Sequence, residues 1–285
     1  MKYNLWSKKV IDSVLSEAGF TFKKSLGQNF LTNPMICPSM AEAAADKDTG
    51  VIEIGLGVGV LTAELAEVAK RVVGIELDER LKPVLEKTLE DYNNVKLIFS
   101  DVLKLDLNKV IAENFADCKK VAVCANLPYY ITSPIIMSLL ESKLPIDNIT
   151  VMVQKEAADR LCAKIPSREV GAVTLAAAYY AEREILFKVP RSSFTPSPNV
   201  DSAVIQFKIR SSPEISTNNE KLLFRIIRGA FEHRRKTLVN SISSAGVVPK
   251  EKLILALDKL GIKPTVRAEE LTLEQFARLT DILSD

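Results

Sequence analysis

The hydrophobic pattern along the first two thirds of the chain alternates between short apolar runs and longer amphipathic stretches. The short runs are rich in valine and isoleucine, as buried strands are. Helical patterns separate most of them, which predicts parallel strands joined by right-handed helical crossovers. We predict seven strands, over residues 51–54, 72–75, 95–99, 121–125, 149–153, 184–189 and 200–209.

The last two predicted strands are connected differently. Residues 190–199 are too few for a helical crossover, so this pair should be antiparallel. The fold class that we predict is therefore α/β, with a doubly wound, seven-stranded sheet and one antiparallel strand.

Beyond this sheet the pattern becomes wholly helical. Serine, threonine and asparagine within residues 211–219 mark a linker. Helical spacing then covers residues 220–231, 235–243, 250–260 and 273–282. We predict a first domain over residues 1–212, which includes an N-terminal extension, and a small all-helical domain over residues 213–285. Near the start of the chain, Asn33-Pro34 is expected to begin a helix.

Composition narrows the class of protein. The chain has 285 residues, 47% hydrophobic and 26% charged, and no apolar run approaches the roughly 20 residues that a membrane span needs. Four scattered cysteines suit structural thiols in a reducing cytoplasm, so we expect a cytoplasmic protein that is not in a membrane. His233 is the single histidine, which leaves a histidine-based zinc site or a Ser-His-Asp triad almost nothing to build on. No metal is expected.

A glycine-rich turn follows the first predicted strand. Gly55, Gly57 and Gly59 come at alternate positions after Glu53, and glycine there lets the backbone approach a ligand closely. Dinucleotide-binding folds use a similar turn, but their GxGxxG spacing needs a glycine where this chain has Val60.

Acidic residues follow the next two strands. Glu76 comes about 20 residues after the turn, where a carboxylate can accept both ribose hydroxyls of an adenosine ligand. Asp101, after the third strand, is placed to accept from an adenine amino group. A solvated carboxylate at a strand end is the alternative interpretation of Glu76.

The fourth predicted strand ends in Asn126-Leu127-Pro128-Tyr129. An amide, a proline and an aromatic residue suit a pocket wall at the carboxyl edge of a parallel sheet, where open α/β folds bind ligands. A strand followed by an ordinary proline turn is the alternative.

Basic residues gather beyond the linker. Lys221, Arg225 and Arg228 recur at three- and four-residue steps opposite the apolar face of the first C-terminal helix, and residues 233–236 (HRRK) follow. Such clusters suit phosphate neutralisation, with a solvated surface as the alternative. His233 fits this basic turn better than a catalytic role.

These segments together resemble the ribosomal RNA adenine dimethyltransferase family, and its bacterial small-subunit (16S) branch in particular. The resemblance runs from residue 24 to residue 202 in family order and extends through residues 231–238. Its motifs are residues 24–31 (KSLGQNFL), the Gly55 turn, Glu76, Asp101, residues 126–130 (NLPYY) and residues 194–202 (FTPSPNVDS). Leu56, where the family often has proline, and His233, where glutamine is expected, depart from the pattern.

The resemblance implies a Rossmann-like fold that binds S-adenosyl-L-methionine (SAM) and transfers methyl groups to N6 of two adjacent adenosines, in a hairpin loop near the 3′ end of 16S rRNA. The implied partner is 16S rRNA or the assembling small ribosomal subunit, with a role in subunit biogenesis and a monomeric enzyme. The implied catalytic residues are Asn126, Leu127, Pro128, Tyr129 and Phe194. The implied cofactor-binding residues are Asn29, Leu31, Gly55, Gly57, Glu76, Leu77, Asp101, Val102 and Asn126. RNA contacts are expected from Lys23, Lys24, Arg191, Arg225, Arg228, Arg234, Arg235 and Lys236.

Two other functions stand as hypotheses. An RNA-binding assembly factor with a vestigial SAM fold would keep the basic surface, but intact Asn126, Glu76 and Asp101 argue against it. A nicotinamide-dependent dehydrogenase is more distant, because its sheet lacks the terminal hairpin. Within the family, residues 130–133 and 200–203 favour the 16S branch over the 23S rRNA methyltransferases.

Overall fold

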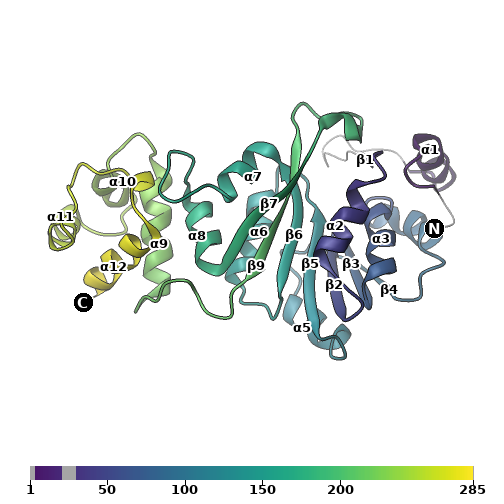
Figure 1. Ribbon diagram of the computed structural model, residues 1–285, viewed down its shortest axis with the longest axis horizontal. Helices are drawn as coiled ribbons and strands as arrows, with labels where there is room; N and C mark the ends of the chain where they lie inside the picture. The colour runs from purple at the N-terminus through teal and green to yellow at the C-terminus, as the bar shows by residue number, and fades with distance from the viewer. Residues whose placement is uncertain (1–3, 21–29, 285) are drawn as a thin grey trace. The chain divides into compact units, whose positions relative to one another are not determined.

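The computed structural model describes residues 4–20 and 30–284, and its centre is a seven-stranded sheet (Figure 1). The strand order is β4-β3-β2-β5-β6-β9-β7. The strands are β2 (Thr49–Ile54), β3 (Arg71–Glu76), β4 (Val95–Phe99), β5 (Lys120–Asn126), β6 (Asn148–Gln154), β7 (Ala181–Val189) and β9 (Ser202–Ile209). β9 begins later than predicted, at Ser202 instead of residue 200, and the other strands span their predicted segments.

The directions of the strands follow the expected plan. β2 pairs in parallel with β3 and β5, and the outer pairs β3–β4 and β5–β6 are parallel as well. β9 runs antiparallel to β6 and lies between β6 and β7. The predicted fold class, a doubly wound sheet of seven strands with one reversed strand, is confirmed.

Helices cover the middle of the sheet because its central strands β2, β5 and β6 are buried on both faces. Every residue of β2 is buried, as expected for a central parallel strand. α2 (Ile36–Ala44) packs on α3 (Val60–Val68) and against β5 and β6. The other helices along this part of the chain are α1 (Lys8–Glu17), η2 (Glu79–Leu81), α4 (Lys82–Thr88), α5 (Leu107–Asn114), α6 (Thr132–Glu141), α7 (Lys155–Leu161) and η3 (Arg191–Ser193).

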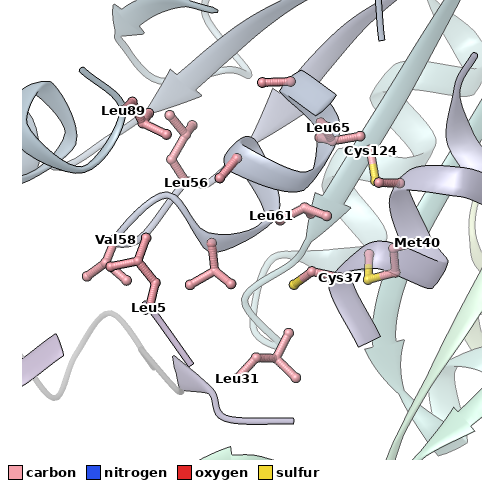
Figure 2. Close-up of a cluster of buried hydrophobic side chains, with 14 of the residues drawn as sticks. Leu5, Leu31, Cys37, Met40, Leu56, Val58, Leu61, Leu65, Leu89 and Cys124 are labelled. Atoms are coloured by element: carbon pink, nitrogen blue, oxygen red, sulfur yellow. The ribbon is translucent and has the colours of Figure 1, made fainter. Parts of the chain in front are cut away.

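One hydrophobic cluster joins the N-terminal segment to α2 and α3 (Figure 2). Leu5, Met40 and Leu65 are completely buried in it. Cys37 and Cys124 belong to the same cluster, and burial raises the pKa of both thiols well above the usual value. They are therefore neutral packing residues at physiological pH.

A second compact unit comprises Asp159–Arg183 and Arg210–Asp285, while Met1–Ala158 and Glu184–Ile209 form the first. The second unit is built around α9 (Glu220–Glu232), which packs against α8, α10 and α12. Its helices are α8 (Ala172–Tyr180), α10 (Leu238–Ser244), α11 (Lys250–Lys259), η4 (Ala268–Glu270) and α12 (Leu273–Ser284).

The second unit is larger than the C-terminal segment expected from the sequence. Besides the residues after the linker, it takes in α8 and the residues before it, which the sequence pattern assigns to the first domain. Tyr180 of α8 stacks on Phe224 of α9, with ring centroids 5.5 Å apart, and its hydroxyl donates to Glu220 Oε1 at 2.9 Å. These contacts give α8 its place in the helical unit.

Two helix starts differ from the prediction. α2 begins at Ile36 rather than at Asn33-Pro34, because Asn33 Oδ1 accepts the Met35 N–H in a turn that precedes the helix. α10 begins at Leu238 rather than at residue 235, because Thr237 is its N-cap. No helix within residues 4–20 and 30–284 combines the length and apolar character needed to cross a membrane.

Candidate functional site

The carboxyl ends of β2, β3, β4 and β5 border one cavity, the expected place for a ligand in an open α/β sheet. All five predicted catalytic residues line it: Asn126, Leu127, Pro128, Tyr129 and Phe194. The predicted cofactor residues Leu31, Gly55, Gly57, Glu76, Leu77, Asp101 and Val102 line it too. Asn29 lies outside the described residues. Segments from across the first unit therefore meet where the sequence predicts a site.

The glycine turn is held in place by the Glu76 carboxylate. The three turn glycines have φ angles of 76°, 56° and 87°, in the left-handed region that glycine favours. Glu76 Oε2 accepts the N–H groups of Leu56 and Gly57 at 2.8 and 3.2 Å, and Oε1 accepts the Asp78 N–H at 2.9 Å. These bonds occupy most of the roughly four acceptor positions of a carboxylate. Glu76 is thus a support of the turn, a role that the sequence did not predict, and has limited capacity left for a ligand.

Asp78 connects Glu76 to the N-terminal part of the chain. The Arg80 guanidinium forms a fork on the Asp78 carboxylate, with Nε to Oδ1 at 2.8 Å. Its Cζ lies 4.9 Å from the centre of the Phe20 ring, a cation–π contact. A chain of contacts therefore links the end of the α1 segment to the glycine turn, through Phe20, Arg80, Asp78 and Glu76.

Glu53 is a site residue that the predicted set omits. It is completely buried, it lines the cavity, and neither carboxylate oxygen has a hydrogen-bond partner among the described residues. Burial raises its pKa to about 8; the nearby Thr62 hydroxyl offsets part of the increase, and Glu76 adds to it. An unpartnered buried carboxyl group is costly and suits a cationic ligand group. Its position at the head of the glycine motif was the signal available in the sequence.

Asn126 and Leu127 present two acceptors to the cavity. Asn126 ends β5 in register with Met152, and the Leu127 N–H donates to the Met152 carbonyl at 3.2 Å, so the backbone here is fixed by β6. No donor within the described part of the chain reaches the Asn126 Oδ1 or the Leu127 carbonyl. Both oxygens are therefore available to a bound substrate.

Tyr129 is pinned by a residue from the other end of the first unit. Its hydroxyl and the hydroxyl of Ser202, the first residue of β9, are 2.9 Å apart. The half-buried ring of Tyr129 therefore has a fixed place in the cavity wall. This contact gives Ser202, noted in the sequence only as part of a motif, a physical role.

A two-stranded sheet brings Phe194 and Leu31 together at the cavity. β1 (Phe30–Leu31) pairs antiparallel with β8 (Phe194–Thr195), and Leu31 is the register partner of Phe194. The Thr32 N–H extends the pairing by donating to the Ser193 carbonyl at 2.8 Å. Phe194 is 4% exposed, so it is a core residue as well as a cavity wall, whereas the sequence indicated only a loop.

Asp101, Val102 and Leu77 form another part of the wall. Asp101 Oδ1 accepts the Leu103 N–H at 3.1 Å, and Oδ2 lies 3.7 Å from Lys104 Nζ. Leu77 is 55% exposed, which is unusual for leucine and leaves apolar surface for a flat ring. This wall combines a carboxylate with apolar side chains, as an adenine ring requires.

The predicted RNA-binding residues differ in their surroundings. Arg225, Arg228 and Arg235 are exposed on and just after α9, and Arg225 and Arg228 border a shallow groove. Arg234 is anchored instead, because its Nη2 donates to the Arg168 carbonyl at 2.9 Å. Lys236 Nζ donates to Ser244 Oγ at 3.3 Å, and Arg191 is exposed in η3. Lys23 and Lys24 lie outside the described residues.

A protein-family model described as "Ribosomal RNA adenine dimethylase" matches residues 19–285. The chain belongs to the ribosomal RNA adenine dimethylase family. The resemblance predicted from the motifs is confirmed, and so are the enzyme class and the methyl donor: this dimethylase family member is a methyltransferase that uses SAM.

Named relatives of the dimethylase cover nearly the whole chain. This chain is 49% identical over 274 residues to the "Ribosomal RNA small subunit methyltransferase A" of Geobacillus thermodenitrificans, and the match covers 95% of this chain and 94% of the relative. The protein of the same name from Streptococcus thermophilus is 46% identical over 280 residues, with 97% of both chains covered.

Solved structures agree with this assignment. A dimethyladenosine transferase from Plasmodium falciparum superposes with a TM-score of 0.72 at 27% identity, covering 87% of this chain and 95% of that one. The 23S rRNA methyltransferase ErmE gives a TM-score of 0.67 at 27% identity, covering 90% of this chain and 100% of that one.

Proposed function

We propose that this protein dimethylates N6 of two adjacent adenosines in a hairpin loop near the 3′ end of 16S rRNA, in the assembling small ribosomal subunit. The observation that carries the proposal is the pair of unsatisfied acceptors, Asn126 Oδ1 and the Leu127 carbonyl, on the wall of the cavity. Relatives named for the small subunit, which match 95% of the chain, support 16S rRNA as the substrate. The protein acts in the cytoplasm and as a monomer.

The cavity fits SAM. Glu53, a buried carboxyl group without a partner, suits the ammonium group of the methionine end. The acceptor capacity left on Glu76 serves a ribose hydroxyl, and Asp101 accepts from the adenine amino group. Leu77 and Val102 flank the adenine ring. When bound, SAM supplies a methyl group on a positively charged sulfur that departs as a neutral thioether.

The adenine amino nitrogen is a weak nucleophile, because its lone pair is delocalised into the ring. Asn126 Oδ1 and the Leu127 carbonyl accept its two hydrogens and draw the nitrogen towards a tetrahedral geometry. The lone pair then points at the methyl group. Transfer of the methyl group leaves the nitrogen positively charged and acidic, and its proton then passes to water. Because alignment of this kind can supply a large effective molarity, no strong base is needed.

The target base leaves its stack to enter the cavity, at a cost of a few kcal/mol. Tyr129, whose ring is fixed through Ser202, and Phe194, fixed through the β1–β8 pairing, hold its two faces. Base–aromatic stacking contributes about 1–3 kcal/mol per base, enough to offset much of the cost.

Small ribosomal subunits that lack the modification, incubated with labelled SAM, test the proposal. The wild-type protein should transfer methyl groups to adenosine, and mass spectrometry of the digested rRNA should locate dimethyladenosine at two adjacent positions. Asn126→Ala should cut the rate by orders of magnitude while SAM still binds, because the amide acts mainly as the transition state forms. Subunit binding by the wild-type protein without any transfer would favour the assembly-factor hypothesis.

A further inference from the structure

Tyr130 differs from the two other aromatic residues that line the cavity. Its side chain is 60% exposed, whereas Phe194 is 4% exposed and Tyr129 is half-buried. The Tyr129 hydroxyl is bonded to Ser202. The Tyr130 hydroxyl makes no hydrogen bond within the part of the chain that the structure describes. Neighbouring tyrosines thus have opposite surroundings, one pinned in the wall and one presented to solvent.

The backbone that carries Tyr130 is held on both sides. The Pro128 carbonyl accepts the Ile131 N–H and the Thr132 hydroxyl, each at 3.2 Å. Thr132 is 4% exposed and begins α6. The turn therefore fixes the backbone position from which the Tyr130 side chain extends, and the exposure of this residue belongs to a hydrogen-bonded turn. A large aromatic ring held open to water beside a cavity is the usual form of a contact surface.

The proposed substrate provides a matching group. If two adjacent adenosines are modified, one base occupies the cavity while the other is one nucleotide away, at its mouth. Extraction of the target base exposes the face of that neighbour on which it was stacked, so this face is open to stacking. A tyrosine ring stacks on any base without reading its edges.

We propose that Tyr130 is a stacking platform for the nucleotide next to the target adenosine, an inference that rests on the proposed function. It sets the position of the neighbouring base while the target base is in the cavity. The platform favours substrates in which an unpaired base adjoins the target adenosine.

Three variants of Tyr130 distinguish the flat face of the ring from its apolar bulk and from its hydroxyl group. Unmodified small subunits serve as the substrate, and methyl incorporation gives kcat and KM. Tyr130→Ala should raise the KM for subunits about tenfold, equivalent to about 1.4 kcal/mol. Tyr130→Phe, which keeps the ring and loses the hydroxyl, should match the wild type. Tyr130→Leu, which keeps apolar bulk and loses the flat face, should resemble the alanine variant. Equal KM values for the leucine variant and the wild type would overturn the stacking role.

Cofactor affinity and the neighbouring base complete the test. Calorimetry should give the same SAM affinity for Tyr130→Ala and the wild type, and a weakened SAM affinity would assign the ring to the cofactor site and overturn the proposal. With subunits in which one of the two adenosines is replaced by uridine, which stacks less well, the KM penalty of Tyr130→Ala should shrink. An unchanged penalty contradicts the platform. A wild-type protein that methylates no subunit would contradict the proposed function itself, a separate result.

Discussion

Glu53 shows how one buried side chain can make the stability of the folded protein depend on pH. Its pKa in the folded chain is about 8, against an ordinary value of 4.5, because the group is buried. Between these values the folded protein holds a proton that the unfolded chain releases. This contribution to stability is complete below the ordinary pKa and is lost as pH rises through about 8.

The first prediction concerns the stability of the protein without ligand. Glu53→Gln cannot ionise, so it should remove the loss of stability between pH 6 and about 8 and should be the more stable protein at pH 8.5, by a few kcal/mol. Denaturant unfolding at pH 6 and at pH 8.5 measures the free energy of unfolding of both proteins. Glu67→Gln, a change to an exposed carboxylate of α3 that does not line the cavity, is the control. Identical pH dependence in wild type and Glu53→Gln would contradict the assignment.

The second prediction concerns the cofactor. A cation beside Glu53 favours the ionised carboxylate, so SAM binding should release a proton and should tighten as pH rises from about 6 to 8. Glu53→Gln should bind SAM more weakly and should lack this proton release. Calorimetry in buffers of different ionisation enthalpy counts the proton. Equal proton release in both proteins would place the ammonium group elsewhere.

Sequence alone located most of the residues in the cavity, because strand ends and their polar neighbours can be identified from local patterns. It could not show that Glu76 supports the glycine turn or that Glu53 lacks a partner. Those facts depend on which backbone N–H groups fold back onto each carboxylate. The same holds for Tyr129, whose partner Ser202 lies far along the chain.

At the scale of the element, the glycine turn depends on a missing side chain in β3. A Cβ atom on Gly74 would lie 2.5 Å from Leu56 Cδ2 and 3.0 Å from its Cγ. Leu56 is buried, and its N–H is one of the donors to Glu76. β3 and the turn therefore fit together only because position 74 is glycine.

The third prediction follows from this contact. Gly74→Ala should displace Leu56 and the turn, lowering stability by about 1–3 kcal/mol and weakening SAM binding. The double variant Leu56→Ala with Gly74→Ala should recover much of both losses, since it removes the atoms in conflict. Thermal unfolding and calorimetry provide the measurements. If the double variant is no better than Gly74→Ala, the Leu56 contact is not the cause.

The long elements were predictable and the short ones were not. The seven strands have the length and composition that reveal buried β structure. β1 and β8 are two residues each and exist only because they pair with each other, so no local pattern marks them. The starts of α2 and α10 shifted because Asn33 and Thr237 make local turns and caps that compete with earlier helix starts.

At the scale of the whole molecule, the predicted catalytic residues and three of the predicted RNA-binding arginines belong to different compact units. The cavity is formed within the first unit, while Arg225, Arg228 and Arg235 belong to the second. We propose that the second unit, the enlarged form of the predicted C-terminal domain, contacts rRNA through these residues.

The fourth prediction tests this division of roles. Charge reversal at Arg225, Arg228 and Arg235 should weaken binding to small subunits and reduce its salt dependence by roughly one unit of slope per lost phosphate contact. SAM affinity should not change. Charge reversal at Lys250, Lys252 and Lys259, three exposed positions of α11, changes the net charge equally and is the control. An unaltered salt slope would indicate that these arginines do not contact the rRNA.

The pairing of β1 with β8 has a consequence for the order in which the protein is made. Phe30 cannot pair until its partner Thr195 has been synthesised, and the two positions are 195 − 30 = 165 residues apart. At synthesis rates of about 5–20 residues per second, the delay is roughly 8–33 seconds. During that time the growing chain acquires first the glycine turn and then Asn126, but it has no Phe194 to set against Leu31. A ribosome must therefore finish more than half of this protein before the new chain can close its site around a base of ribosomal RNA.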